Sequence, residues 1–156
     1  MRIKIAPLLL FLQAAYSYAD FSGPVVRVID GDTLAVMNGS QMQRVRLEGI
    51  DAPESKQAFG QRSKQELLRL TAHKTVSVIT SSQDRYGRHL GTIFLDGINI
   101  NSVQVRTGMA WAYRFKGKAA NPEYAALERV ARANRAGLWS QQAPVEPWLW
   151  RRNNKH

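Results

Sequence analysis

Two short acidic clusters contain the residues of this sequence that are best suited to chemistry. The first holds Asp30 and Asp32 in the stretch Asp-Gly-Asp-Thr, and the second holds Asp51 and Glu54 in Asp-Ala-Pro-Glu. Both lie at the ends of expected strands. Because Ca²⁺ and Mg²⁺ bind through carboxylate and carbonyl oxygens, the two clusters together are a candidate site for a hard divalent cation.

Each cluster also has an ordinary structural explanation. Asp-Gly between apolar runs is typical of a hairpin turn, and turn statistics alone favour a plain turn at residues 30–33. Pro53 disfavours helix at Ala52, so residues 51–54 form an extended, stiffened segment that could simply end a strand or cap a helix. Either cluster alone is therefore weak evidence for a site.

Arginines occur in two places from which they could reach the acids. Arg44 and Arg46 lie two apart in an expected strand, opposite Val45 and Leu47, so at least one of them could point into a pocket. The ordinary alternative is an exposed strand arginine. The second place is the polar segment Asp-Arg-Tyr-Gly-Arg at residues 84–88, where a turn between strands is expected whatever the function.

Short strands and amphipathic helices would position these residues. Asp-Gly and Asn-Gly dipeptides separate the first apolar runs, as in hairpins. Strands are predicted at residues 24–29, 33–37, 42–47, 74–80 and 89–95, and helices at residues 56–71, 99–107 and 122–136. This order predicts an α+β, mainly β fold, namely a partly open five-stranded OB-fold barrel with about three helices.

Glycines mark the expected ends of the last two helices. Gly108 and Gly137 follow these segments and suit C-terminal capping. One stripe of the last helical segment is apolar and comprises Tyr124, Leu127, Ala131 and Leu138.

The chain is basic and has no cysteine. Its 156 residues include 22 Lys and Arg against 12 Asp and Glu, a formal net charge of +10. This excess favours a polyanionic partner, with nucleic acid modestly ahead of a membrane surface, although solubility alone could explain it. The lack of cysteine excludes disulfides and thiol chemistry. His73, His89 and His156 have no ligand-like spacing, which argues against zinc.

The N-terminus has the layout of a secretory signal peptide. Arg2 and Lys4 precede an apolar run, and Ser17-Tyr18-Ala19 follows it before Asp20. The apolar run is well short of the ~20 residues that a transmembrane helix needs. We therefore expect cleavage after Ala19, a secreted or periplasmic protein and no stable membrane insertion.

The motifs DGDT, DAPE and DRYGR, with an arginine in the strand between the first two, occur in an order that resembles the thermonuclease family, to which staphylococcal (micrococcal) nuclease belongs. The resemblance covers residues 24–139 and includes Phe59-Gly60, Asn101 and the stretches at residues 108–111 and 135–139. It implies a thermonuclease-like OB-fold domain at residues 20–140, which follows the expected signal peptide at residues 1–19. The Trp/Arg-rich tail at residues 141–156 has no counterpart in the type enzyme but resembles the tails of other bacterial relatives.

Position by position, the resemblance implies a metal site and a set of catalytic residues. Ca²⁺ would be bound by Asp32, Asp51 and the backbone carbonyl of Ala52, a position where the type enzyme has threonine. Glu54 would be the general base. The phosphate-binding and nucleotide-binding residues implied by the family are Arg46, Arg88, Tyr86 and Tyr113. Such an enzyme would be a monomer that hydrolyses DNA and RNA to 5′-hydroxyl and 3′-phosphate products.

Two other functions stay open from the sequence. One is a non-catalytic OB-fold module that binds nucleic acid, although such a module would have no need for paired carboxylates that repel phosphate. The other is a structural or plasmid-maintenance protein with incidental nuclease activity. In the tail, Trp148 and Trp150 could pack against the domain or stack on bases, and packing is favoured because apolar aromatics near a terminus usually bury surface.

Overall fold

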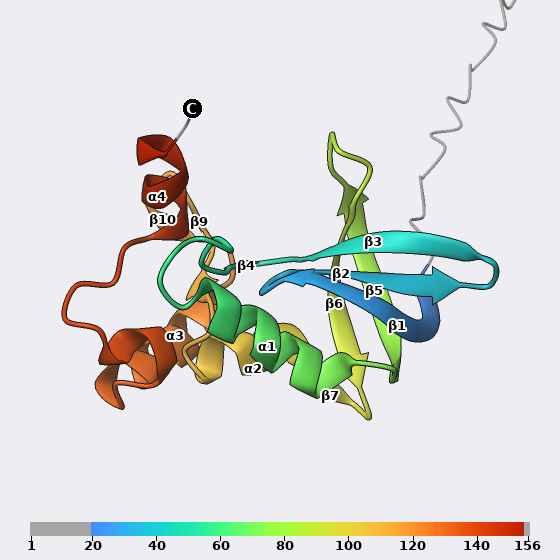
Figure 1. Ribbon diagram of the computed structural model, residues 1–156, viewed down its shortest axis with the longest axis horizontal. Helices are drawn as coiled ribbons and strands as arrows, with labels where there is room; N and C mark the ends of the chain where they lie inside the picture. Colours follow the sequence, from blue (N-terminus) through green and yellow to red (C-terminus); the bar gives the residue numbers. More distant parts are fainter. Residues whose placement is uncertain (1–19, 155–156) are drawn as a thin grey trace, which may run out of the picture.

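Five strands form a closed β-barrel in the computed structural model, which describes residues 20–154 (Figure 1). They are β1 (Phe21–Asp30), β2 (Thr33–Asn38), β3 (Gln41–Leu47), β5 (Thr75–Gln83) and β6 (His89–Leu95). Neighbours pair antiparallel in the order β3-β2-β1-β5-β6, and a parallel pairing of β3 with β6 closes the barrel. The predicted α+β, mainly β, OB-type fold is confirmed, but the barrel is closed and not partly open, because β3 and β6 pair with each other.

Several two-residue strands lie outside the barrel. They are β4 (Ile50–Asp51), β7 (Ile98–Asn99), β8 (Trp111–Ala112), β9 (Arg114–Phe115) and β10 (Lys118–Ala119). The most important pairing joins β4 to β8, with Asp51 opposite Trp111. This pairing fixes the segment that carries Asp51.

The barrel interior is filled by alternating apolar side chains. In β5, for example, Val76 and Val78 are buried while their neighbours are exposed, as the twofold period of a strand requires. Leu67 of α1 (Gly60–Thr71) and Ile100 of α2 (Ile100–Arg106) cover this core. The elements that carry the site are therefore attached to a continuous apolar core.

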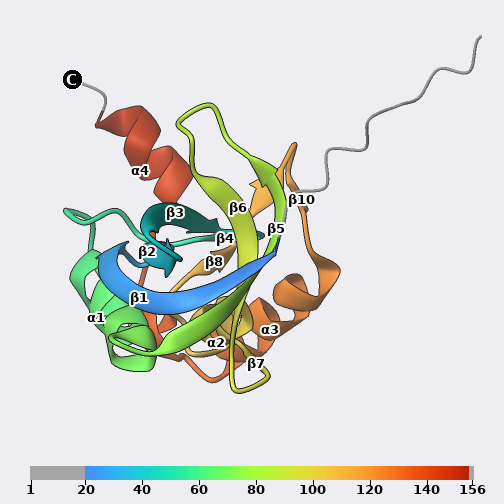
Figure 2. The same cartoon turned by 90° about the vertical axis from the view of Figure 1, so that its right-hand side faces the viewer.

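A second apolar cluster holds the C-terminal elements together. It consists of Trp111, Ala131, Leu138 and Trp139, with Trp148 packed against it. These residues come from β8, α3 (Pro122–Ala133), the 3₁₀ turn η1 (Gly137–Ser140) and α4 (Pro147–Asn153). Figure 2 shows α4 standing apart from the other helices, on the side of the barrel near β3.

The helix boundaries differ from the sequence expectation at two places. The helix predicted at residues 56–71 begins only at Gly60, because Phe59 has a left-handed backbone with φ of 67°. The helix predicted at residues 122–136 ends at Ala133, since Arg135 also has a positive φ, of 52°. Leu138 therefore lies in η1 and not in the helix, although it is buried beside Ala131. The tail helix α4 is an addition to the three helices expected.

The proposed signal peptide at residues 1–19 and His156 lie outside the described residues. Within residues 20–154, none of the helices combines the length and the hydropathy that a membrane crossing needs.

Candidate active site

Three acidic side chains from different segments meet beside one end of β3. Asp32 lies in the turn between β1 and β2, Asp51 ends β4, and Glu54 lies in the loop that leads to α1. The Oδ2 atom of Asp32 accepts a hydrogen bond from the backbone N–H of Ala52 at 2.6 Å. This bond ties the two acidic motifs, which are 20 residues apart, to each other.

Arg46 lies between the two aspartates. Its Nη2 atom is 3.2 Å from Asp32 Oδ2 and 3.3 Å from Asp51 Oδ1. Its Nη1 atom donates to the backbone carbonyls of Leu47 at 2.8 Å and Ile50 at 3.0 Å, so the guanidinium plane is fixed by four partners. Arg44, the other candidate in this strand, is exposed.

Gly31 brings the Asp32 turn against the rest of the site. A Cβ atom at Gly31 would lie 1.9 Å from Ser63 Oγ and 2.8 Å from Ala52 Cβ, so no larger residue fits. The carbonyl of Gly31 also accepts a hydrogen bond of 2.7 Å from the buried Gln104 side chain. The turn interpretation and the site interpretation of this motif are thus both compatible with the geometry.

Two hydrogen bonds between Glu54 and Gln57 close the loop that carries Glu54. Gln57 Oε1 accepts from the backbone N–H of Glu54 at 3.1 Å, and the N–H of Gln57 donates to the carbonyl of Glu54 at 2.8 Å. A Cβ atom at Gly60 would lie 1.9 Å from that same carbonyl oxygen. The absence of a side chain at Gly60 therefore lets the loop fold tightly and sets the position of Glu54.

Burial makes the two aspartates unusual. Asp32 is 6% exposed and Asp51 is 1% exposed. Desolvation raises the pKa of Asp32 to about 6, with the Arg46 charge acting in the opposite direction. Burial also raises the pKa of Asp51, against the hydrogen bonds from Arg151. Both carboxylates therefore lie where an additional positive charge would stabilise the ionised form.

A cavity of about 410 Å³ adjoins Arg46. Arg88 and Tyr113 line it, together with Gly49 and Tyr124 among others. The guanidinium of Arg88 is held by Asp84, with Nε 2.8 Å from Asp84 Oδ2. Arg46 and Arg88 thus border one hollow large enough for a nucleotide-sized group.

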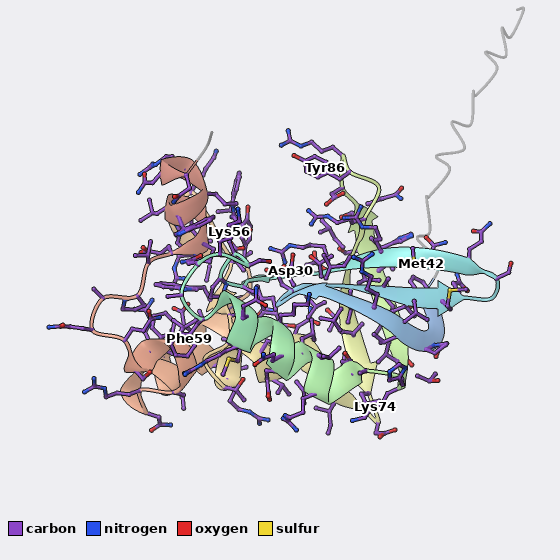
Figure 3. The ribbon with its side chains drawn as sticks, viewed as in Figure 1. Asp30, Met42, Lys56, Phe59, Lys74 and Tyr86 are labelled. Atoms are coloured by element: carbon purple, nitrogen blue, oxygen red, sulfur yellow. The ribbon has the colours of Figure 1, made fainter. Side chains whose placement is uncertain are left out.

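Tyr86 does not line this cavity. Its side chain is 63% exposed at the tip of the loop between β5 and β6, where Figure 3 labels it. The guanidinium carbons of Arg85 and Arg88 lie 4.9 Å and 5.6 Å from its ring centre. The structure therefore brings Tyr113, but not Tyr86, to the cavity wall.

Sequence reasoning missed Arg151. Its Nη2 atom lies 2.8 Å from Asp51 Oδ2, and its Nη1 atom lies 3.1 Å from Asp51 Oδ1 and 2.7 Å from Glu54 Oε1. Trp148 precedes it by three residues, a spacing that places both on one side of a helix. That spacing was the available signal, but it does not reveal which surface the helix contacts.

The donor atoms fit a hard cation, although the set is small. Among residues 20–154, no three side chains of the His, Asp and Glu types are grouped like metal ligands. Asp32 and Asp51 nevertheless each place an oxygen within 3.3 Å of the same Arg46 nitrogen. A cation here would use these two carboxylates, and carbonyl and water oxygens would complete its shell, as is usual for calcium.

A barrel of this type with buried carboxylates and arginines beside a cavity has the layout expected of a staphylococcal-type nuclease, and the comparisons with known proteins show the class. The family model described as "Staphylococcal nuclease homologue" matches residues 44–141. This chain belongs to that family, and it is a nuclease, a hydrolase that acts on nucleic acid.

Three relatives illustrate the range of the family. Micrococcal nuclease of Shigella flexneri is 44% identical over 161 residues, which cover 97% of this chain and 92% of that protein. Protein ParB of Escherichia coli is 46% identical over 160 residues, covering 97% and 90% of the two chains. Staphylococcal-like nuclease CAN1 of Arabidopsis thaliana is 41% identical over 112 residues, 72% of this chain and 34% of that protein.

Proposed function

We propose that this nuclease is calcium-dependent and hydrolyses both DNA and RNA to 5′-hydroxyl and 3′-phosphate products. The observation that carries the proposal is the pair of buried aspartates, Asp32 and Asp51, on either side of Arg46. Together with Glu54 they carry three negative charges against the two positive charges of Arg46 and Arg151, so the cluster would repel phosphate unless a cation neutralised the excess. The similarity to a micrococcal nuclease over 97% of this chain supports the same activity.

Asp32, Asp51 and the carbonyl of Ala52 would hold the cation. When bound, Ca²⁺ would supply Lewis-acid stabilisation of the negative charge on the non-bridging phosphate oxygens. Because the third ligand is a backbone oxygen, alanine at position 52 serves as well as a larger residue.

Glu54 would act on the attacking water. Its side chain is partly exposed, so water can reach it, and its backbone is held by Gln57. Glu54 takes a proton as the water oxygen attacks phosphorus and the bond from phosphorus to the 5′ oxygen breaks. The 5′ oxygen takes a proton from solvent water as it leaves, which gives the 5′-hydroxyl, and the phosphate stays on the 3′ side.

Arg46 and Arg88 would hold the phosphate. Guanidinium groups can bind phosphate through two N–H groups and keep their charge at any working pH. Arg46 is already oriented by backbone carbonyls, whereas Arg88 would exchange Asp84 for a phosphate oxygen. In this arrangement Arg88 stabilises the leaving oxygen.

Tyr113 would border the bound nucleotide from the cavity wall, and Tyr86 would approach it from the exposed tip of the β5–β6 loop. Contacts centred on phosphate carry no base information, so weak sequence preference and a steep loss of binding with salt are expected.

The test is digestion of plasmid DNA and of RNA by the purified protein with Ca²⁺, with Mg²⁺ and with a calcium chelator. We expect degradation of both substrates with Ca²⁺ and none with chelator, and 3′-phosphate ends identified by phosphatase-dependent extension. Degradation that survives chelation would overturn the proposed mechanism. Glu54→Gln should still bind nucleotide but turn over more slowly, and unchanged turnover would remove Glu54 from the mechanism.

We also propose that the chain is exported, to the periplasm or outside the cell, and acts as a monomer. The intact mass of protein isolated from its natural compartment should then correspond to a chain that begins at Asp20. Light scattering should give the mass of one chain.

A further inference from the structure

The guanidinium of Arg151 forms the most extensive side-chain contact with the proposed metal and base residues. Both of its terminal nitrogens donate hydrogen bonds to Asp51, and one of them also donates to Glu54, at distances between 2.7 and 3.1 Å. Parallel N–H donors on one carboxylate form the strongest type of ion-pair geometry. Asp51 itself is almost fully buried, which strengthens the contact further.

Contacts between the tail helix α4 and the rest of the protein hold Arg151 next to Asp51 and Glu54. Trp148 packs edge to face on Trp111 with ring centres 5.7 Å apart, and Pro147 is buried. Just before the helix, the carbonyl of Val145 accepts a hydrogen bond of 2.6 Å from Gln57, in the loop that carries Glu54. Figure 3 shows α4 beside that loop, near the labelled Lys56.

Arg151 uses the same oxygen atoms that the proposed chemistry needs. Asp51 Oδ2 accepts from Arg151, and Asp51 Oδ1 accepts from both Arg151 and Arg46. A carboxylate has about four lone-pair sites, so three are already used. A divalent cation at Asp51 would also lie close to the Arg151 charge and be repelled by it. Glu54 Oε1, which must take a proton from water, is likewise engaged.

We propose that Arg151 and the divalent cation compete for Asp51, so that the C-terminal helix sets the metal affinity of the enzyme. This inference rests on the proposed calcium dependence. In the absence of the cation, Arg151 is hydrogen-bonded to both the proposed metal ligand, Asp51, and the proposed base, Glu54. Cation binding moves the guanidinium away from Asp51 and releases Glu54 for the attacking water.

Arg152 provides a matched control. It follows Arg151 in the same helix, carries the same charge and is exposed. Replacing either arginine with glutamine lowers the net charge of the protein by the same amount. Only the replacement of Arg151 removes the contacts with Asp51 and Glu54.

The test is calorimetric titration of Ca²⁺ into the full-length mature protein and into the variants Arg151→Gln and Arg152→Gln, without substrate. Since couplings between two ligands typically amount to roughly 5-fold to 150-fold, we expect Arg151→Gln to bind Ca²⁺ about tenfold more tightly. Arg152→Gln should stay within about twofold of the parent, because an exposed charge is screened by salt. Equal or weaker binding by Arg151→Gln, or an equal gain in both variants, overturns the competition.

A second measurement needs no substitution and therefore does not depend on the variant folding. In protein labelled with ¹⁵N at arginine, the side-chain signals of Arg151 should change on saturation with Ca²⁺ while those of Arg152 stay in place. An Arg151 signal that is unchanged at saturation contradicts the proposal. If Ca²⁺ binds to none of the three proteins, the proposed calcium dependence fails as well. If it binds with equal affinity to all three, only the competition fails.

Discussion

The buried carboxylate of Glu128 in α3 accepts a hydrogen bond of 3.0 Å from the backbone N–H of Ala112 in β8. Ala112 is in turn paired with Ile50, the residue before Asp51. Glu128 also forms ion pairs with Arg114 and Arg132. Glu128, which is not part of the acidic cluster, thus supports β8, the strand that pairs with the segment carrying Asp51.

Glu128→Ala should destabilise the protein strongly. The substitution removes the carboxylate partner of Arg114 and leaves the buried N–H of Ala112 without its acceptor, and an unsatisfied buried donor costs about 1–3 kcal/mol. Urea unfolding followed by circular dichroism measures this loss. Glu123→Ala, an exposed acid in the same helix, is the control and should change stability by less than about 1 kcal/mol. Equal losses in the two variants would contradict the supporting role.

Asp32→Asn should stabilise the metal-free protein at neutral pH. The folded-state pKa of Asp32 is raised from 3.8 to about 6, so the native state binds more protons than the unfolded state between these values. The stability contribution of Asp32 is thus present below about pH 4 and is lost as pH rises through about 6. Removing the charge should recover on the order of 1–3 kcal/mol at pH 7.

Thermal unfolding between pH 4 and pH 8 in the presence of a chelator tests this expectation. The difference between Asp32→Asn and the parent should grow as pH rises through about 6 and then level off. Asp32→Asn should also lose nuclease activity, because it removes a proposed metal ligand.

Gly60→Ala should impair catalysis. A Cβ atom at this position meets the carbonyl oxygen of Glu54 at 1.9 Å, so the loop must open to accommodate it. Misplacing a catalytic group by about 1 Å can reduce rate by on the order of 100-fold. Gly39→Ala is the control, since a Cβ atom there meets nothing within 4 Å although φ is positive. It should cost some stability and leave kcat unchanged; a similar loss of kcat in both would contradict the prediction.

Arg46→Ala and Arg88→Ala should each reduce kcat/KM by on the order of 100-fold to 1000-fold, the usual effect of removing one donor to a transition-state charge. Lysine at either position should restore only part of the rate, because it lacks the planar fork. Arg44→Ala, in the same strand as Arg46 but exposed, should keep nearly full activity at low salt. Loss of activity in Arg44→Ala equal to that in Arg46→Ala would argue for a general charge effect.

The barrel could be predicted from the sequence because its strands alternate buried and exposed residues and are separated by turn dipeptides. The start of α1 could not, since the left-handed backbone of Phe59 is imposed by the closed loop of Glu54 and not by local propensity. The proximity of Asp32, Arg46 and Asp51 could be predicted from the order of the motifs. That prediction depended on the family resemblance, because the spacing of the residues alone does not show that they lie together.

The role of the tail depended on tertiary contacts. A sequence can show that Trp148 and Arg151 share a helix face, but only packing on Trp111 determines that this face meets Asp51. The exposed position of the Tyr86 side chain could not be predicted from the sequence either. A polar loop has no periodic pattern that indicates which way its side chains point.

The parallel contact between β3 and β6 spans only Val45 to Leu47 on one strand and His89 to Gly91 on the other, and it pairs Arg46 with Leu90. The two proposed phosphate-binding arginines come from chain segments some forty residues apart, and this contact is what makes them neighbours. A chain in which β3 and β6 are not paired lacks the contact that brings Arg46 and Arg88 together. We therefore expect the unfolded chain to leave nucleic acid uncut until the barrel has closed.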